Sequence, residues 1–163
     1  MDRIISSYIS VYKEQLAKGE IQKAYSFLLK YLMQLKADFE KSFLKGYSFG
    51  NVSPGYLDIS YFPFFNGYLR DHKLRFGLVL VHSEMRFELW LLGQNKKIQA
   101  KYWERLKTSP WNRARKNMPK YSVLETILIE NPDFDTVDQL TADIIKKAAA
   151  AAEEIEAYLK NQA

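Results

Sequence analysis

Apolar side chains recur every three or four positions through the first quarter of the chain, a spacing that predicts helices. The first predicted helix spans residues 2–17 and stops at Gly19, because glycine is common just past a helix end. The second starts near Glu20 and ends at Gly46, and it is expected to lie across a sheet or against the first helix. Its apolar stripe comprises Ile21, Ala24, Tyr25, Leu28, Tyr31, Leu32, Leu35, Phe39 and Phe43.

A period of two then follows and predicts strands. Residues 46–55 are expected to form a loop, because three glycines and a proline interrupt them. Residues 56–62 alternate as a strand does, and Pro63 then removes a donor from the ladder. Residues 74–81 are apolar on both faces, which predicts a central strand covered on both sides. Residues 86–92 alternate again, and a short link joins the last two strands into a hairpin.

Helix and strand patterns alternate in the last third of the chain. Asn95 is a suitable N-cap for a helix over about 96–107, and residues 108–120 look irregular. Residues 121–129 are rich in β-forming side chains. The run from Thr136 to Gln139 resembles a capping box, and it opens a last helix that extends to about residue 160 through a run of alanines.

The predicted order of elements is therefore α-α-β-β-β-α-β-α. This order indicates an α+β fold in which helices pack on a mainly antiparallel sheet of about four strands. A length of 163 residues suits one domain, residues 1–163, because typical domains contain roughly 100–200 residues.

The composition excludes several classes of site. The chain has no cysteine, which excludes disulfides and thiolate metal sites and favours a reducing compartment. The longest apolar run, from Phe76 to Val81, is far shorter than the ~18 residues of a membrane span, and no secretory signal is recognisable. We therefore expect a cytoplasmic protein without membrane contact. No glycine-rich phosphate loop occurs and the two histidines lack an obvious third ligand, so neither a cofactor nor a metal is expected.

Positive charge is concentrated between residues 96 and 120, where nine basic residues accompany a single acid, Glu104. Basic side chains bind phosphates and nearby aromatic rings can stack on bases, so this segment predicts binding of nucleic acid or another polyanion. The other interpretation is a solvated face that keeps the protein soluble. The predicted polyanion-binding residues are Lys97, Lys101, Arg105, Trp111, Arg113, Arg115 and Lys116.

Two stretches of the chain carry a resemblance. The first reads GYLDISYF from Gly55 to Phe62, and the second, Leu74 to Trp103, contains a hairpin ending in Phe-Glu-x-Trp-Leu-x-Gly and a helix ending in Tyr-Trp. In these features the chain resembles an uncharacterised family of small bacterial proteins, over roughly residues 45–135. That family has no assigned activity, so the resemblance implies a relative and no mechanism.

The order α-β-β-β-α-β also looks like the core of PD-(D/E)xK nucleases. Those enzymes hold a divalent cation with an Asp on one strand and a Glu-x-Lys on the next. Asp58 and Glu88 match the two carboxylates, but Trp90 stands where the lysine is required. His82, at the end of a predicted strand, is a third catalytic candidate. In the structural interpretation the carboxylates pair with Arg75 or Arg86, and the histidine is a turn residue.

Two functional hypotheses follow. The first is a non-enzymatic intracellular interaction domain that binds nucleic acid or a protein through the basic segment. The second is an enzyme, for example a diverged metal-dependent nuclease-like hydrolase, whose cleft requires Asp58, Glu88, Tyr61, Trp90 and His82 to share one pocket. Self-association into a homodimer, through a strand edge or a tyrosine-rich patch, is a third hypothesis.

Overall fold

Five strands form one antiparallel sheet in the computed structural model, which describes residues 2–42 and 46–162. Each strand pairs with the next along the chain, in the order β1-β2-β3-β4-β5. The predicted α+β class and mainly antiparallel sheet are confirmed, with one strand more than expected. The strands are β1 (Ser48–Phe49), β2 (Ile59–Phe65), β3 (Leu74–Val81), β4 (Arg86–Gly93) and β5 (Leu124–Ile129).

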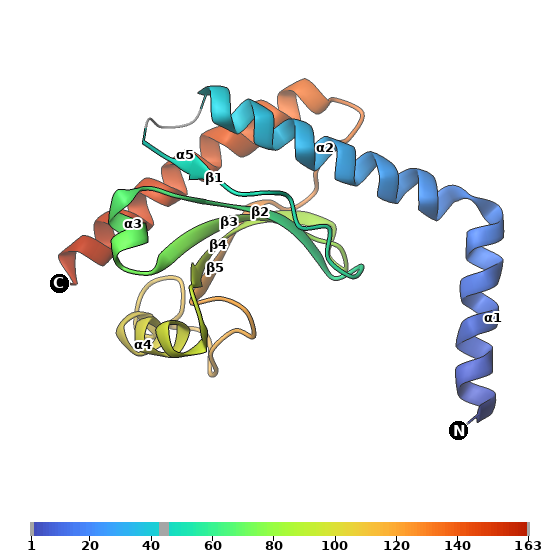
Figure 1. Cartoon of the computed structure of the whole chain (residues 1–163), viewed down its shortest axis with the longest axis horizontal. Coiled ribbons are helices and arrows are strands. Elements are labelled where there is room, and N and C mark those ends of the chain that lie inside the picture. Colours follow the sequence, from blue (N-terminus) through green and yellow to red (C-terminus); the bar gives the residue numbers. More distant parts are fainter. Residues whose placement is uncertain (1, 43–45, 163) are drawn as a thin grey trace.

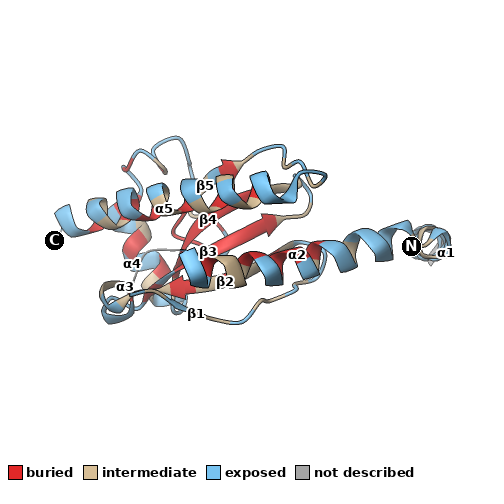
Figure 2. Ribbon diagram, turned by 90° about the horizontal axis from the view of Figure 1, so that it is seen from above, coloured by how far each residue is buried: buried red, intermediate tan, exposed pale blue. Residues whose placement is uncertain are grey.

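Helices cover the two faces of this sheet unequally (Figure 1). The helices α2 and α5 lie side by side across one face, as the view from above also shows (Figure 2). The helix α4 lies on the other side, close to the end of β4, and α1 stands clear of the sheet. The helices are α1 (Asp2–Lys18), α2 (Glu20–Ser42), α3 (Gly67–Asp71), α4 (Lys96–Leu106) and α5 (Val137–Asn161).

The main hydrophobic core fills the space between the sheet and the pair α2 and α5. Successive side chains of a strand point to opposite faces, so Phe76, Leu78 and Leu80 of β3 share the face toward the helices, and all three are buried. From the other side, the predicted stripe of α2 supplies fully buried side chains such as Leu35. The predicted continuation of that stripe to Phe43 lies outside the described residues.

Small side chains allow α5 to approach the sheet closely. Ala148 and Ala152 are completely buried, whereas Ala150, on the opposite side of the helix, is exposed. The alanine run predicted to favour helix therefore also determines how α5 packs, because larger residues at the two buried positions would hold the helix away from the sheet.

The second strand begins later than its alternation predicts. Gly55 and Leu57 both have positive φ angles, 72° and 65°, and they form a tight turn. A side chain at Gly55 would place its Cβ only 1.9 Å from the carbonyl oxygen of Ile59, so the turn requires glycine. The regular strand therefore starts at Ile59 instead of residue 56.

The same strand continues through Pro63, where the ladder was expected to stop. The carbonyl of Pro63 accepts a 2.8 Å hydrogen bond from the N–H of Gly50, the residue directly after β1. In an antiparallel pair the nitrogen and carbonyl of one residue face the same neighbour, so the nitrogen of Pro63, which carries no hydrogen, also faces the short edge strand β1 and not β3. The pairing with the central strand β3 is preserved, and Pro63 lies opposite Gly77 in the register.

Three local features differ from the sequence prediction. The expected loop 46–55 contains the two-residue strand β1. The short helix α3 was not predicted, although Asn66 caps it by accepting a 2.9 Å bond from the N–H of Leu69. The capping-box prediction is wrong, because Thr136 makes no side-chain cap bond. The side chain of Gln139 instead donates to Asp143, one turn further along α5.

Candidate functional site

A pocket of about 360 Å³ opens on the sheet face that α2 and α5 leave uncovered. Its walls are strand side chains that point to the sheet face opposite the main core: Tyr61 of β2, Arg75 of β3, and Trp90 and Leu92 of β4. The turn before β2 and the side chain of Tyr121, which precedes β5, contribute the rest of the lining. The pocket is thus concave and largely aromatic, as sites for small organic groups commonly are.

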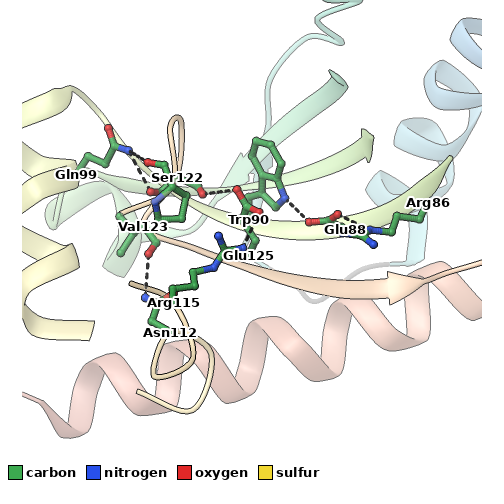
Figure 3. A network of polar contacts seen from close by, with 10 residues as sticks. Arg86, Glu88, Trp90, Gln99, Asn112, Arg115, Ser122, Val123 and Glu125 are labelled. Atoms are coloured by element: carbon green, nitrogen blue, oxygen red, sulfur yellow. Dashed lines mark hydrogen bonds and ion pairs between the residues drawn. The ribbon is translucent and has the colours of Figure 1, made fainter. Parts of the chain in front are cut away.

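Trp90 is the most constrained of the aromatic rings. Its Nε1 donates a 2.9 Å hydrogen bond to Oε1 of Glu88, and the other oxygen of Glu88 accepts a 2.7 Å bond from Nε of Arg86 (Figure 3). Glu88 is only 3% exposed, so these two bonds satisfy a buried carboxylate. The indole of Trp90 is therefore held in one orientation as a wall of the pocket.

The turn before β2 forms the rim. Oδ1 of Asp58 accepts a 2.9 Å bond from the backbone N–H of Tyr56. This N–H, followed by that of Ile59, holds the pKa of the Asp58 carboxyl below its ordinary value, so the carboxylate is ionised at neutral pH. The turn presents Tyr56 almost entirely to solvent, at 94% exposure. A ligand entering the pocket would meet this ring first.

Arg75 is the cation that lines the pocket. Its side chain is exposed and makes no ion pair within the part of the chain that the structure describes. It also lines a smaller neighbouring pocket of about 160 Å³, together with Arg70 and Lys73. The aromatic pocket therefore adjoins a smaller pocket lined by cations, and Arg75 belongs to both.

The opposite rim of the pocket belongs to the segment that links α4 to β5. The ammonium group of Lys120 lies 5.0 Å from the ring centre of Tyr121, a cation–π arrangement. The side-chain amide of Gln99, buried in α4, donates to the carbonyls of Pro119 and Ser122 at 2.9 and 3.1 Å (Figure 3). The rim is therefore fixed from below, although it belongs to no strand or helix.

A second anchor holds the middle of the same linking segment. Asn112 is completely buried, and its amide donates a 3.0 Å bond to the carbonyl of Val123 (Figure 3). Asn95 caps α4, as predicted, by accepting a 2.9 Å bond from the N–H of Ile98. Side-chain hydrogen bonds therefore fix both the start of α4 and the middle of the segment that follows it.

The three predicted catalytic candidates do not share one pocket, although the N–H of His82 donates a 3.0 Å hydrogen bond to the carbonyl of Asp58. Asp58 lines the pocket, but Glu88 does not, because its carboxylate is engaged with Arg86 and the Trp90 indole. The expected pairing of Glu88 with Arg86 is present, within one strand and not across strands. His82 does not line the pocket either. Of the five residues that the enzyme hypothesis requires in one cavity, only Asp58, Tyr61 and Trp90 line it.

His82 contacts a serine, but in an arrangement unsuited to nucleophilic catalysis. Its Nε2 lies 2.8 Å from Oγ of Ser60, whose hydroxyl donates to the carbonyl of Pro54 at 2.6 Å. With its one proton committed there, Ser60 accepts from the imidazole and cannot donate to it. Ser60 is also completely buried. The pair joins the turn before β2 to the end of β3, which is a structural role.

The predicted polyanion-binding residues have mixed surroundings. Trp111 is half-buried and packs edge-on against Tyr158 of α5, 5.4 Å between ring centres, so part of its ring is used in packing against the core. Arg115 is paired with Glu125 at 3.0 Å. Lys101 and Arg105 both lie over the ring of Tyr102. Lys97, Arg113 and Lys116 are exposed and make no ion pair within the described ranges.

Sequence reasoning missed three residues of this pocket as a site: Tyr56, Arg75 and Tyr121. A signal for one of them was present, because Arg75 is the only charged residue in an otherwise apolar strand. Its parity places it on the face opposite Phe76, away from the core. The two tyrosines lie outside regular strands, so no periodicity could have placed them.

No group of three metal-ligating side chains that could hold an ion occurs among residues 2–42 and 46–162. Within the same ranges, no helix has both the length and the apolar character needed to cross a bilayer.

Comparison with known proteins places the chain in a family. Residues 5–159 match the model of a family described as Domain of unknown function (DUF7000). The chain belongs to this family. The match confirms the resemblance to an uncharacterised family and extends it beyond residues 45–135, to nearly the whole chain. No curated protein and no solved structure matches the chain significantly. The DUF7000 description assigns no activity, so a functional proposal must rest on the pocket itself.

Proposed function

We propose that this DUF7000 chain is a binding domain for single-stranded nucleic acid, and that the aromatic pocket receives a base while the neighbouring cations contact phosphates. The observation that carries the proposal is the position of Arg75, an exposed cation without an ion-pair partner among the described residues, where the aromatic and basic pockets meet. A cytoplasmic location is part of the same proposal.

The aromatic lining supports the recognition of a base. Proteins that hold single strands without strict sequence preference stack bases on aromatic side chains, each worth about 1–3 kcal/mol. Here Tyr61 and Trp90 form the inner walls, and Tyr56 and Tyr121 stand at the rim. The fixed indole of Trp90 would lose little conformational entropy when a base binds, which favours affinity.

The cations around the pocket support the recognition of a phosphate backbone. Beside Arg75, the smaller pocket is lined by Lys73 and by Arg70, whose guanidinium also lies 3.7 Å from the carboxylate of Asp71. On the other side Lys120 accompanies the rim tyrosine Tyr121. A nucleic-acid strand that leaves the pocket in either direction would therefore meet positive charge, which is the electrostatic requirement for binding a polyanion.

This proposal changes the role of the basic segment 96–120. The segment supplies Lys120 at the rim and Lys97 near the start of α4, while its tryptophan, Trp111, packs against Tyr158 and does not line the pocket. We propose that the remaining exposed cations of the segment contribute general attraction and not a defined contact.

Fluorescence anisotropy with labelled 12-nucleotide RNA and DNA single strands, and with a duplex, tests the proposal. We expect binding of single strands that weakens steeply as salt rises, because counterions are released from the phosphates. Arg75→Gln should weaken binding several-fold and reduce the salt dependence by the equivalent of about one phosphate contact. Tyr121→Ala should weaken binding by roughly 5- to 100-fold through lost stacking.

Arg113→Gln is the matched control, because Arg113 is also an exposed cation but does not line either pocket. An equal loss in Arg113→Gln and Arg75→Gln would show that binding follows net charge and that the pocket is not the site. Absence of binding to either single strand at low salt would end the proposal. Cleavage of the strand with Mg²⁺, abolished by Asp58→Asn, would favour the hydrolase alternative.

A further inference from the structure

The first helix of the chain exposes an unusually complete apolar face. Every side chain from Ile4 to Glu14 is exposed. Six large apolar side chains in this stretch are between 52% and 66% exposed: Ile4, Ile5, Tyr8, Ile9, Val11 and Tyr12. In Figure 1, α1 descends from the far end of α2 and stands away from the sheet and from α5.

These side chains gather on one side of the helix. At about 100° per residue, the apolar positions from Ile4 to Leu16 cover an arc of roughly 160°, wider than the ~100° stripe of an ordinary surface helix. Ser10 lies on the opposite side of the helix, and no charged residue occurs between Ile4 and Tyr12. The exposed face is therefore neutral, broad and separated from the polar face.

A helix of this composition is not expected to persist alone. Most helices in proteins gain their stability from packing of an amphipathic face more than from the intrinsic preference of their residues for helix. The helix α1 contains β-branched residues, tyrosines and three serines, which are weaker helix formers than alanine. A surface that covers its apolar face would stabilise it.

We propose that this surface is a second copy of the chain, with the apolar face of α1 packed antiparallel on the same face of its partner around Tyr8. Tyr8 lies at the middle of the exposed apolar stretch, so a two-fold axis there brings the isoleucines at positions 4 and 5 of each copy toward Val11 and Tyr12 of the other. The stripe is thus complementary to itself.

The available area agrees with a dimer. If a full side chain of this size presents ~150–200 Å², six that are 52–66% exposed offer roughly 600 Å² per chain. Two such faces reach about 1,200 Å², the lower limit of a specific interface, and each alone matches the largest apolar patch usually tolerated on a monomer. A membrane surface fits less well, because helices that lie on bilayers are rich in Lys or Arg along the polar face, whereas here serines occupy its centre and Lys18 is paired with Glu14.

Sedimentation equilibrium on the full chain at micromolar concentration measures the assembly. We expect a mass twice the 19.1 kDa of the chain. Tyr8→Glu places a charge at the centre of the interface and should raise the dissociation constant by about 100-fold or more. Ser10→Glu places the same charge on the opposite face and should leave the dimer intact. Circular dichroism of both variants verifies that each retains its helices.

Cysteine cross-linking locates the contact, because the chain has no cysteine of its own. Under mild oxidation Tyr8→Cys should form a covalent dimer, whereas Ser10→Cys should not. A monomeric wild-type chain at 100 µM, or a dimer unaffected by Tyr8→Glu, would overturn the proposal. Binding of monomeric chain to phosphatidylcholine–phosphatidylserine vesicles, lost in Tyr8→Glu, would also overturn it and would assign the face to membranes.

Discussion

Glu88 and Trp90 lie two residues apart on the same face of β4, and the carboxylate of the first accepts a 2.9 Å hydrogen bond from the indole of the second. Alternation places both side chains on the sheet face opposite α2 and α5, and both are buried there. Glu88 thus acts on the candidate site indirectly. Its carboxylate positions the indole of Trp90, which is a wall of the pocket, and forms an ion pair with Arg86.

Removal of this carboxylate should destabilise the fold. We expect Glu88→Ala to lower the free energy of unfolding by about 3 kcal/mol, because it leaves a partly buried guanidinium and the indole N–H without their acceptor. Glu130→Gln is the matched control, because Glu130 also lies near Arg86, at 3.7 Å, but is 66% exposed. An exposed pair of this kind should contribute less than about 1 kcal/mol. Urea denaturation measures the free energy of unfolding of both variants. Equal losses would contradict the view that the buried Glu88 is the partner that stabilises Arg86 and Trp90.

A second prediction concerns pH and His82. Burial lowers the pKa of this imidazole, and the nearby Asp58 carboxylate only partly opposes that effect. The folded state therefore binds the proton less readily than the unfolded state, whose histidine pKa is about 6.5. The stability that neutral His82 contributes to the folded state is therefore fully present above about pH 6.5, and it is lost as the pH falls below that value. Wild type should be more stable at pH 7.5 than at pH 5.

A substitution isolates that contribution. His82→Gln retains a donor toward Ser60 but does not titrate, so the stability difference between pH 7.5 and pH 5 should shrink. His72→Gln changes the other histidine of the chain, which is exposed, and serves as the matched control. Urea denaturation at the two pH values measures the effect. Unchanged pH dependence in His82→Gln would show that another group is responsible.

Residues 74–92 show how far periodicity predicts this fold. A continuous apolar run identified β3, alternation identified β4, and the short link between them indicated the hairpin. The helix bounds followed equally well from spacing and from caps such as Asn95. The two-residue strand β1 has too few residues to show any period, and the passage of β2 through Pro63 depends on which side its missing N–H faces.

The candidate site was harder to predict than the fold. Trp90 and Tyr61 were placed in one hypothetical cleft from their strand positions, and the pocket contains both. Glu88 was expected to share that cleft as the second carboxylate of the nuclease-like pattern, but its hydrogen bonds to Arg86 and to the Trp90 indole depend on side-chain positions that the sequence does not show. Tyr56 and Tyr121 meet at the pocket from irregular segments far apart in sequence, which only the tertiary structure brings together.

The packing of α5 gives a third prediction. Ala148→Leu adds three carbons at a completely buried position against the sheet, so it should lower the free energy of unfolding by about 1–3 kcal/mol. Ala150→Leu makes the same change on the exposed side of the same helix and should alter stability by no more than about 0.5 kcal/mol. Thermal or urea denaturation compares the pair. Equal effects would mean that helix propensity, and not close packing, dominates at these alanines.

The fourth prediction tests the support of the pocket rim. Gln99 is 5% exposed, and its amide is the donor shared by the carbonyls of Pro119 and Ser122. Gln99→Met keeps the length of the side chain but removes that donor, which leaves buried carbonyls without a partner at a cost of about 1–3 kcal/mol. Gln94→Met is the matched control, because Gln94 is exposed and the substitution is chemically identical.

Amide hydrogen exchange then separates a local effect from a global one. If Gln99 fixes the rim, exchange in Gln99→Met should accelerate most between residues 107 and 123, where the segment has few backbone hydrogen bonds of its own. Binding of single-stranded nucleic acid should weaken in the same variant, because Tyr121 would no longer be held beside the pocket. Uniform acceleration over the whole sheet would indicate that Gln99 stabilises the fold as a whole and has no special relation to the rim.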